Sequence, residues 1–272
     1  MKLKEIPGSL LTALRLKWLR LGPLHQHTDD PIPVIVSLTS IPSRLPIIHL
    51  TIRSLLAQRR KPELVVLWLN ERLRGQLPAA LTRLEGPLFS IRFADMDCPH
   101  RKLVHARAAF PGKTIVTCDD DLMYDDSWLQ RLYADHEPFP DAVIAHECRY
   151  ITRDAAGELL PYKQWPTALE PGVSAPNLMP IGYGGVLFPP ESLDPRVDDR
   201  EQFLALTPRA DDLWFKAMAH LRGTVTRRSR DPGRKPTPIG GSQKVSLKKT
   251  NVRQDGNRET WQTLCDHFGI NI

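Results

Sequence analysis

The feature of this sequence that most restricts its fold is an alternation of short apolar runs with segments of helical periodicity. Apolar runs occupy 33–38, 64–69 and 114–118, and two further runs occupy 89–93 and 142–146. Strands that are apolar on both faces are typical of a parallel sheet covered by helices. Between the runs, the spacing of apolar residues predicts helices at 45–58, 77–84, 101–110 and 127–135. Repeated strand–helix alternation predicts an α/β fold with a Rossmann-like, mostly parallel sheet flanked by helices.

A cluster of carboxylates follows one of the apolar runs without a break. The run that ends at Cys118 leads directly into Asp119, Asp120 and Asp121. Open α/β sheets bind ligands at the carboxyl ends of their strands. Three adjacent carboxylates repel one another, and a hard cation such as Mg²⁺ or Mn²⁺ relieves that cost. We therefore expect a metal site that holds nucleotide phosphates. The alternative is a solvated acidic turn that caps the next helix.

The second half of the sequence is less regular than the first. An aromatic stretch at 161–166 is followed by a glycine-rich segment at 182–185 and a short apolar run at 186–188. A helix is then predicted with two acids, Asp211 and Asp212, in its first turn. Acids in that position suit the helix dipole, so helix capping accounts for one of them.

The chain divides into three expected parts. Residues 1–32 form a basic amphipathic segment and linker, and residues 33–221 form one catalytic domain. Residues 222–272 are expected to pack on the same domain, with a basic, flexible loop at 222–249 and a terminal helix at 261–268.

The charge and the cysteines restrict the partners and the compartment. The net charge of +6 suits anionic partners, namely nucleotide phosphates, anionic lipid or nucleic acid. The four cysteines form no CxxC pair, which favours reduced thiols in a cytoplasmic protein. No apolar run approaches the roughly 20 residues that cross a bilayer.

The N-terminal segment combines apolar and basic residues at near-helical spacing. The apolar residues are Leu10, Leu11, Leu14, Trp18, Leu19 and Leu21, and the basic ones are Lys2, Lys4, Arg15, Lys17 and Arg20. This pattern predicts that residues 1–21 lie on an anionic membrane surface, at the inner face of the plasma membrane. The alternative is a helix packed on the domain itself.

An ordered set of segments carries a resemblance to a known class of enzyme. The segments are 36–44, Lys61-Pro62, Asp119 to Asp121, 184–190 and Asp211 to Trp214. In this order they resemble the GT-A class of nucleotide-sugar glycosyltransferases, and more closely bacterial enzymes of capsule and surface-polysaccharide assembly. The resemblance implies a GT-A-like domain that moves a sugar from a nucleotide diphosphate donor to a glycan or lipid-linked acceptor.

The resemblance also implies roles for individual residues. Asp119 and Asp121 match the acids of the DxD motif and would bind Mn²⁺ or Mg²⁺ at the donor diphosphate, with Asp120 between them. Asp212, or its neighbour Asp211, would be the general base of an inverting transferase. The other expected donor contacts are Thr39, Ser40, Arg44, Lys102, Gly184 and Gly185, and the expected acceptor contacts are Tyr162 and Trp165. Each has a structural alternative, such as a surface ion pair for Arg44 or core packing for Tyr162 and Trp165.

Two other functions remain open at this point. A nucleotidyltransferase also uses carboxylates and Mg²⁺ at a strand end, but it releases pyrophosphate and usually has a glycine-rich loop after its first strand. Here that loop, 39–42, contains no glycine. A non-catalytic module that binds nucleic acid or membrane would suit the basic stretch at 222–249. That module leaves both aspartate clusters without a purpose, and we expect no nucleic-acid partner.

Overall fold

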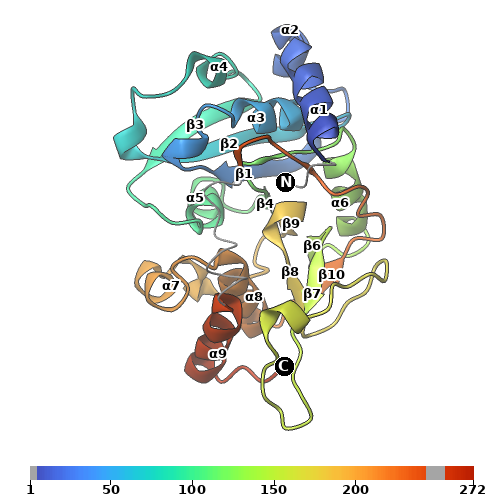
Figure 1. The fold of residues 1–272 in the computed structure, drawn as a ribbon, viewed down its shortest axis with the longest axis vertical. Coiled ribbons are helices and arrows are strands. Elements are labelled where there is room, and N and C mark those ends of the chain that lie inside the picture. The colour runs from blue at the N-terminus through green and yellow to red at the C-terminus, as the bar shows by residue number, and fades with distance from the viewer. Residues whose placement is uncertain (1–4, 243–254) are drawn as a thin grey trace.

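The structure is a computed structural model, and it describes residues 5–242 and 255–272. Its centre is a seven-stranded sheet in the order β10-β6-β9-β4-β1-β2-β3 (Figure 1). Six strands run in one direction, and β9 is antiparallel to both of its neighbours. The strands are β1 (Ile32–Thr39), β2 (Pro62–Asn70), β3 (Phe89–Ala94), β4 (Thr114–Thr117), β6 (Val143–Ala145), β9 (Val186–Phe188) and β10 (Thr226–Arg228). The predicted α/β class with a mostly parallel sheet is confirmed.

The two faces of this sheet are each buried in a separate apolar core. Along β1, Ile35 faces one core, while Val34 and Val36 face the other. On β4, Ile115 and Val116 divide between the two cores in the same way. Because successive side chains of a strand point to opposite faces, only continuous apolar runs can fill both cores. The unbroken Val, Ile and Leu runs of the sequence are explained by this double burial.

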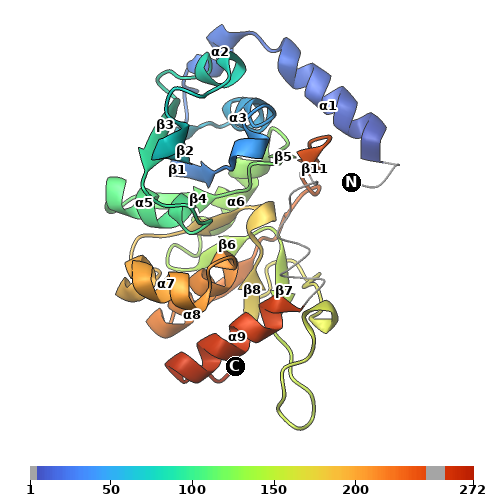
Figure 2. The same cartoon turned by 60° about the vertical axis from the view of Figure 1, so that its left-hand side comes forward.

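Helices cover both faces. The helices α3 (His49–Leu56), α4 (Ala79–Thr82) and α6 (Trp128–His136) contribute to one core, and α5 (Arg101–Ala109) and α8 (Asp211–Arg222) contribute to the other. The helices α7 (Arg200–Leu206) and α9 (Gly256–Phe268) lie beside α8, and Figure 2 shows these three on the opposite side of the sheet from α3. The apolar side chains of α9 that pack there include Trp261 and Leu264.

The N-terminal segment forms α1 (Ile6–Trp18) and the short α2 (Leu21–His25), which lie over α3 at the periphery of the molecule (Figure 2). The buried Arg53 of α3 fixes the end of α1, because its guanidinium donates to the carbonyls of Leu16 at 2.6 Å and Lys17 at 3.2 Å and to that of Leu19. Among the described residues, no helix is long and apolar enough to span a bilayer.

Two small antiparallel pairs lie outside the central sheet. One pairs β5 (Leu122–Met123) with β11 (Thr237–Pro238), directly after the aspartate triplet, and Ile239 N–H donates to the Asp121 carbonyl at 2.9 Å. The other pairs β7 (Cys148–Tyr150) with β8 (Leu178–Pro180). Short 3₁₀ turns lie at Pro42–Arg44, Glu71–Leu73, Tyr162–Gln164, Gly182–Gly184 and Pro195–Asp198.

Several predicted elements differ from those observed. The helix expected at 45–58 is shorter, because a 3₁₀ turn at Pro42–Arg44 precedes it and α3 begins only at His49. The loop expected at 222–249 contains β10 and β11, and its residues from 243 onward lie outside the described part of the chain. The division into three parts at 32 and 221 stays a prediction.

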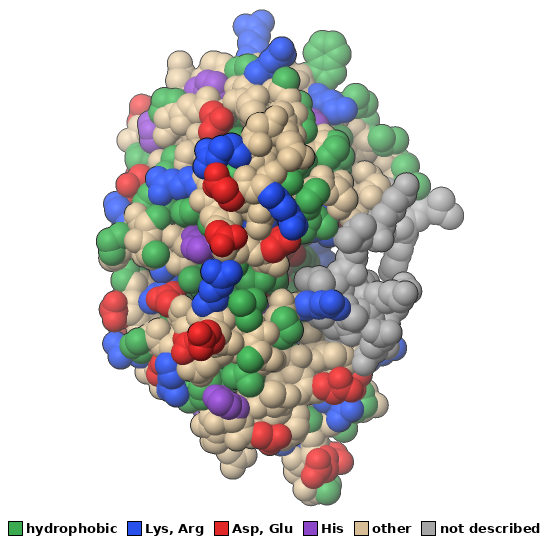
Figure 3. Space-filling model, turned by 90° about the vertical axis from the view of Figure 1, so that its left-hand side faces the viewer, with side chains coloured by type: hydrophobic (Ala, Val, Ile, Leu, Met, Phe, Trp, Pro, Cys, Tyr) green, Lys and Arg blue, Asp and Glu red, His purple; other side chains and the backbone are tan. Residues whose placement is uncertain are grey.

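Charges of both signs are mixed on the face that Figure 3 shows. Lys and Arg side chains lie there among Asp and Glu side chains rather than in a separate field. Proteins that bind nucleic acid through its backbone usually present a continuous basic patch or stripe. The described residues of this face do not form such a patch.

Candidate functional site

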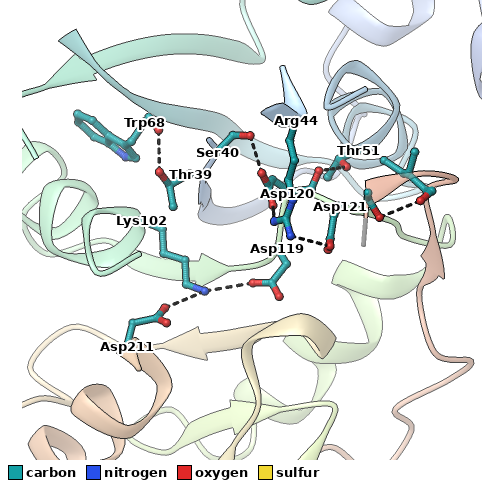
Figure 4. Close-up of polar contacts among 12 residues, drawn as sticks. Thr39, Ser40, Arg44, Thr51, Trp68, Lys102, Asp119, Asp120, Asp121 and Asp211 are labelled. Carbon is teal, nitrogen blue, oxygen red and sulfur yellow. Dashed lines mark hydrogen bonds and ion pairs between the residues drawn. The ribbon is translucent and has the colours of Figure 1, made fainter. Parts of the chain in front are cut away.

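The aspartate triplet lies where β4 ends, beside the carboxyl end of β1. Asp120 is buried, and its carboxylate accepts hydrogen bonds from Ser40 and from the guanidinium of Arg44. Its backbone carbonyl accepts a further bond from the hydroxyl of Thr51 at 2.9 Å. Asp121 is also buried and lies 3.1 Å from the other Nη of Arg44 (Figure 4). The loop that follows β1 therefore places one arginine against two of the three acids.

These contacts do not fully compensate the charge of the two acids. Burial raises the pKa of Asp121 to about 6, although Arg44 opposes the shift, and the neighbouring aspartates add to it. Burial likewise raises the pKa of Asp120 against the effect of Arg44. The ionised triplet is therefore costly in this fold, and a further cation would lower that cost.

Lys102 joins the two aspartate clusters that the sequence places almost a hundred residues apart. Its buried ammonium on α5 lies 3.2 Å from Asp119 Oδ1 and 3.0 Å from Asp211 Oδ2, as Figure 4 shows. Burial opposes the charge, yet Asp211 and Asp119 raise the pKa of Lys102 well above its ordinary value. The ammonium thus stays charged, and it lies between the triplet and the start of α8.

Asp211 and Asp212 differ in environment although they are adjacent. Burial alone raises the pKa of Asp211, but Lys102 more than offsets it and the net shift is downward. For Asp212, burial and then the charge of Asp211 raise the pKa to about 7. Its Oδ2 accepts a bond from Gly182 N–H at 2.9 Å, and a Cβ on that glycine would lie 2.6 Å from Asp212 Oδ1. Asp212 can therefore exchange a proton near neutral pH.

The end of β1 is held by an arginine that the sequence analysis missed. Arg101 is buried, and its guanidinium donates to the carbonyls of Ser40 and Met96, each at 2.6 Å, and to the hydroxyl of Thr39. The Thr39 hydroxyl in turn donates to the carbonyl of Trp68 on β2 at 2.9 Å. Thr39 is thus engaged within the protein, and Arg101 fixes the loop that carries Ser40. The only signal in the sequence was a basic residue at a predicted helix start.

The glycines expected at a donor sugar instead allow close packing before β9. The carbonyl of Gly184 accepts a bond from the indole of Trp128 at 2.7 Å. Gly185 has φ +101°, and a Cβ there would lie 2.5 Å from the Trp128 ring. A Cβ on Gly184 would lie 2.9 Å from Cγ of Glu147. Close packing alone requires glycine at both positions, so finding glycine there is no evidence that either residue contacts a ligand.

The aromatic residues expected at the acceptor belong to a core. Tyr162 is 6% exposed and Trp165 is 1% exposed, and their ring centroids are 5.1 Å apart. The indole of Trp165 donates to the carbonyl of Leu160 at 2.8 Å. Buried rings offer no open face to a sugar, so the packing alternative describes them in this structure.

A second tyrosine, Tyr124, connects the triplet to the glycine-rich turn. Its hydroxyl accepts a bond from Asp119 N–H at 3.0 Å and donates to the carbonyl of Tyr183 at 3.1 Å. The hydroxyl of Tyr183 donates to Glu147 at 2.8 Å, and Lys235 lies 3.2 Å from the same carboxylate. This chain of contacts holds the main chain of Asp119 in place.

The expected metal ligands meet only part of what a closed metal site requires. Within residues 5–242 and 255–272, no three side chains of His, Cys, Asp or Glu gather as a metal-binding group. Mg²⁺, however, commonly takes one or two carboxylates and completes its shell with water and substrate phosphates. Asp119 and Asp121 fit that open type of site. The side chain of Asp119 is 37% exposed, and burial with the neighbouring acids disfavours the ionised form of Asp121, which a bound cation would stabilise.

No family model matches the sequence, and no curated protein matches it. Solved structures of similar fold do exist. One is CMP:2-keto-3-deoxy-manno-octonic acid synthetase complexed with CTP, at 14% identity and TM-score 0.40, which covers 73% of this chain and 89% of that chain. A second is 4-diphosphocytidyl-2C-methyl-D-erythritol synthase from Anaerococcus prevotii, at 10% identity and TM-score 0.47, with 84% and 95% covered. A third is UDP-glucose pyrophosphorylase complexed with UDP-glucose, at 8% identity and TM-score 0.43, with 88% and 99% covered. At these values the likeness concerns the fold alone.

These comparisons correct the functional expectation. The three structures are nucleotidyltransferases, and none of them is a glycosyltransferase. The expectation of a glycosyltransferase finds no support among these structures, and the findings agree better with the alternative of a nucleotidyltransferase. Nothing in the matches points to capsule or surface-polysaccharide assembly.

Proposed function

We propose that this protein is a metal-dependent nucleotidyltransferase, which binds a nucleoside triphosphate at the carboxyl edge of β1 and β4. The observation that carries the proposal is a pair of cations, Arg44 and Lys102, held on two sides of the aspartate triplet. A planar guanidinium suits a phosphate that it grips with two nitrogens, and an ammonium acts as a point charge. Because Arg44 and Lys102 lie on different sides of the triplet, they can each contact a different phosphate group of one polyphosphate chain.

The charge balance of the site argues for a metal ion as well. The site holds five carboxyl groups but only three cationic side chains. The carboxyl groups belong to Asp119, Asp120, Asp121, Asp211 and Asp212, and the cations are Arg44, Arg101 and Lys102. A triphosphate brought to this site without a counterion would meet net repulsion. Asp119 and Asp121 would hold Mg²⁺ or Mn²⁺, which supplies charge compensation for the leaving pyrophosphate. Metal-dependent binding follows from this balance.

The side chains have separate tasks in the proposed reaction. An acceptor oxygen forms a bond to the α-phosphorus while the bond to the bridging oxygen of the β-phosphate breaks, and pyrophosphate leaves. Lys102 and Arg44 orient the phosphates and offset the charge that develops on them. When the acceptor is a hydroxyl, Asp212 takes its proton, because a pKa of about 7 suits a general base at neutral pH.

One feature favours nucleotidyl transfer over sugar transfer on physical grounds, and a second counts against it. The groups that handle phosphate lie at the site, whereas Tyr162 and Trp165 are occupied by core packing. The loop after β1 lacks the glycines whose amides often cradle phosphates. In their place, Arg44 presents a guanidinium directly at the triplet.

The products distinguish the two reactions. We expect pyrophosphate from one of the four common nucleoside triphosphates in the presence of Mn²⁺ and a pool of sugar phosphates and alcohols. The measurement is a pyrophosphatase-coupled phosphate assay.

Lys102→Met should lower kcat/KM by about 10²–10³-fold, since it removes a charge aimed at the transition state. Lys113→Met, which removes an exposed lysine paired with Glu63, is the control. Release of a nucleoside diphosphate from sugar nucleotides, without pyrophosphate from any triphosphate, would contradict the proposal.

A further inference from the structure

Helix α1 has apolar side chains on two opposite faces. Its inner face includes the buried Leu16 and Ser9, and Leu16 packs with Leu50, Met123 and Ile239 in a small core. Its outer face carries large apolar side chains that the structure leaves in solvent: Leu10 is 58% exposed, Leu11 69%, Leu14 51% and Trp18 83%. The alternative of a helix packed on the domain therefore describes the inner face, and the membrane alternative stays a prediction about the outer face. The helix packs on the domain, and it also presents an apolar stripe outward.

The outer residues form one continuous stripe with basic borders. At about 100° per residue, Leu10, Leu14, Trp18 and Leu11 fall within roughly 100° of arc on the helix surface. Arg15 follows Leu11 on one side of the stripe, and Lys17 borders Leu10 on the other. Both are exposed, as is Arg20 beyond the end of the helix. We call these four apolar residues, with Arg15 and Lys17, the α1 stripe.

Contacts at both ends of α1 keep the stripe facing outward. At one end, the guanidinium of Arg53 binds three carbonyls, those of Leu16, Lys17 and Leu19. Nearer the other end, the hydroxyl of Ser9 donates to the Pro238 carbonyl of β11 at 2.7 Å. Turning the helix inward would break these buried bonds and empty the position of Leu16 in its core. The stripe is thus a fixed part of the surface.

We propose that the α1 stripe docks this protein on the surface of an anionic lipid bilayer. An apolar stripe bordered by cations matches the boundary between acyl chains and anionic headgroups. Pairing of two stripes from two copies of the chain fits less well, because basic borders would then face basic borders. The net charge of +6 also favours attraction of the protein to an anionic lipid surface. This inference goes beyond the proposed function and does not depend on it.

The first test is co-sedimentation with vesicles. The wild-type protein should sediment with vesicles of phosphatidylglycerol and phosphatidylcholine, less with pure phosphatidylcholine, and less again as salt increases. Leu11→Gln/Leu14→Gln/Trp18→Gln should lower the partition coefficient at least about ten-fold, because it removes most of the apolar area that would be buried. Arg15→Gln/Lys17→Gln should remove the preference for anionic lipid.

A matched control uses exposed apolar residues elsewhere on the surface. Leu169 is 73% exposed and Val225 is 53% exposed, and neither lies on α1. Leu169→Gln/Val225→Gln should bind vesicles as the wild type does. All variants should release pyrophosphate from soluble substrates at the wild-type rate, so a failure of this proposal is distinct from a failure of the proposed function.

Tryptophan fluorescence provides a second readout that depends on one side chain. The chain has six tryptophans, and all except Trp18 are at most 6% exposed. A blue shift on addition of vesicles would therefore report Trp18. Trp18→Phe should retain binding and lose the shift, because phenylalanine keeps the apolar contact.

Three outcomes would overturn the proposal. Wild-type protein that stays in the supernatant with anionic vesicles is one. Equal sedimentation of the wild type and the triple glutamine variant is another. The third is a wild-type dimer in solution that the triple variant abolishes without any change in vesicle binding, since the stripe would then join two copies of the chain.

Discussion

At the scale of single residues, Lys102 has the most demanding position in the site. A buried ammonium is stable only with close negative partners. Here the two partners, Asp119 and Asp211, come from different parts of the sequence. Because both acids need the same cation, loss of Lys102 would leave two carboxylates in mutual repulsion. The two aspartate clusters that the sequence places far apart, Asp119 to Asp121 and Asp211 to Asp212, are therefore brought together around the ammonium of Lys102.

Asp212 links this site to the pH dependence of stability. Its pKa is raised from 3.8 to about 7, so the folded state holds the proton more tightly than the unfolded chain does. The resulting stability is fully present below pH 3.8 and is lost as the pH rises through about 7. Asp212→Asn cannot ionise. It should raise the melting temperature at pH 8 by about 2–4 °C, roughly 1 kcal/mol, relative to the wild type.

Thermal melts from pH 4 to pH 8 test this expectation. The difference between variant and wild type should shrink as the pH falls and vanish near pH 4. Asp141→Asn, which changes an exposed carboxylate, serves as the control and should show no such trend. A constant difference across the whole range would mean that Asp212 is ionised in the folded protein throughout.

At the scale of elements, the sequence predicted most of the sheet. Strands with continuous apolar runs were found because burial on both faces leaves no polar alternation. The direction of β9 was not predictable, since the apolar residues 186–188 read equally well in either direction. For the strand β10, Thr226-Arg227-Arg228, the sequence predicts a loop, because an edge strand needs little apolar surface and leaves no apolar run to detect.

Part of the candidate site, like part of the sheet, was predictable from the sequence. The triplet at a strand end and the loop with Arg44 both follow from the general geometry of parallel sheets. The contact of Asp211 with Lys102 was not, because it depends on how α8 packs against α5 in three dimensions. The packing of Tyr162 was also hidden, since an aromatic side chain looks the same in sequence whether it is buried or exposed.

The start of β9 gives a sharp test of packing between elements. Gly185→Ala would force a Cβ to within 2.5 Å of the Trp128 ring on α6, at a φ of +101° that alanine rarely adopts. We expect the free energy of unfolding to fall by about 2–4 kcal/mol. The measurement is unfolding in urea.

A second glycine separates strain from collision. Gly223 has φ +79°, and a Cβ there would meet no atom within 4 Å. Gly223→Ala should therefore lower the free energy of unfolding by about 1 kcal/mol only. Equal losses in the two variants would show that Trp128 moves aside at no cost.

At the scale of the whole molecule, ligand binding should stabilise the fold in a metal-dependent way. A nucleoside triphosphate at 100 times its Kd adds about 2.7 kcal/mol, or about 5–10 °C for a domain of this size. Mn²⁺ should be required for this shift. Asp121→Asn should lose the Mn²⁺-dependent part, whereas the surface variant Asp126→Asn should keep it. An unchanged shift in Asp121→Asn, measured by differential scanning fluorimetry, would place the metal elsewhere.

The reversed strand β9 has a consequence for the protein during its synthesis. The strand β9 lies between β4 and β6 in the sheet, yet it leaves the ribosome after both of them. Until residues 186–188 emerge, the nascent chain carries β3, β2, β1 and β4 with one open edge beside the aspartate triplet. Open edges pair readily with other strands, and incomplete sheets are prone to aggregate. The interval between the synthesis of β4 and that of β9 is therefore when the nascent chain is most exposed to misassembly.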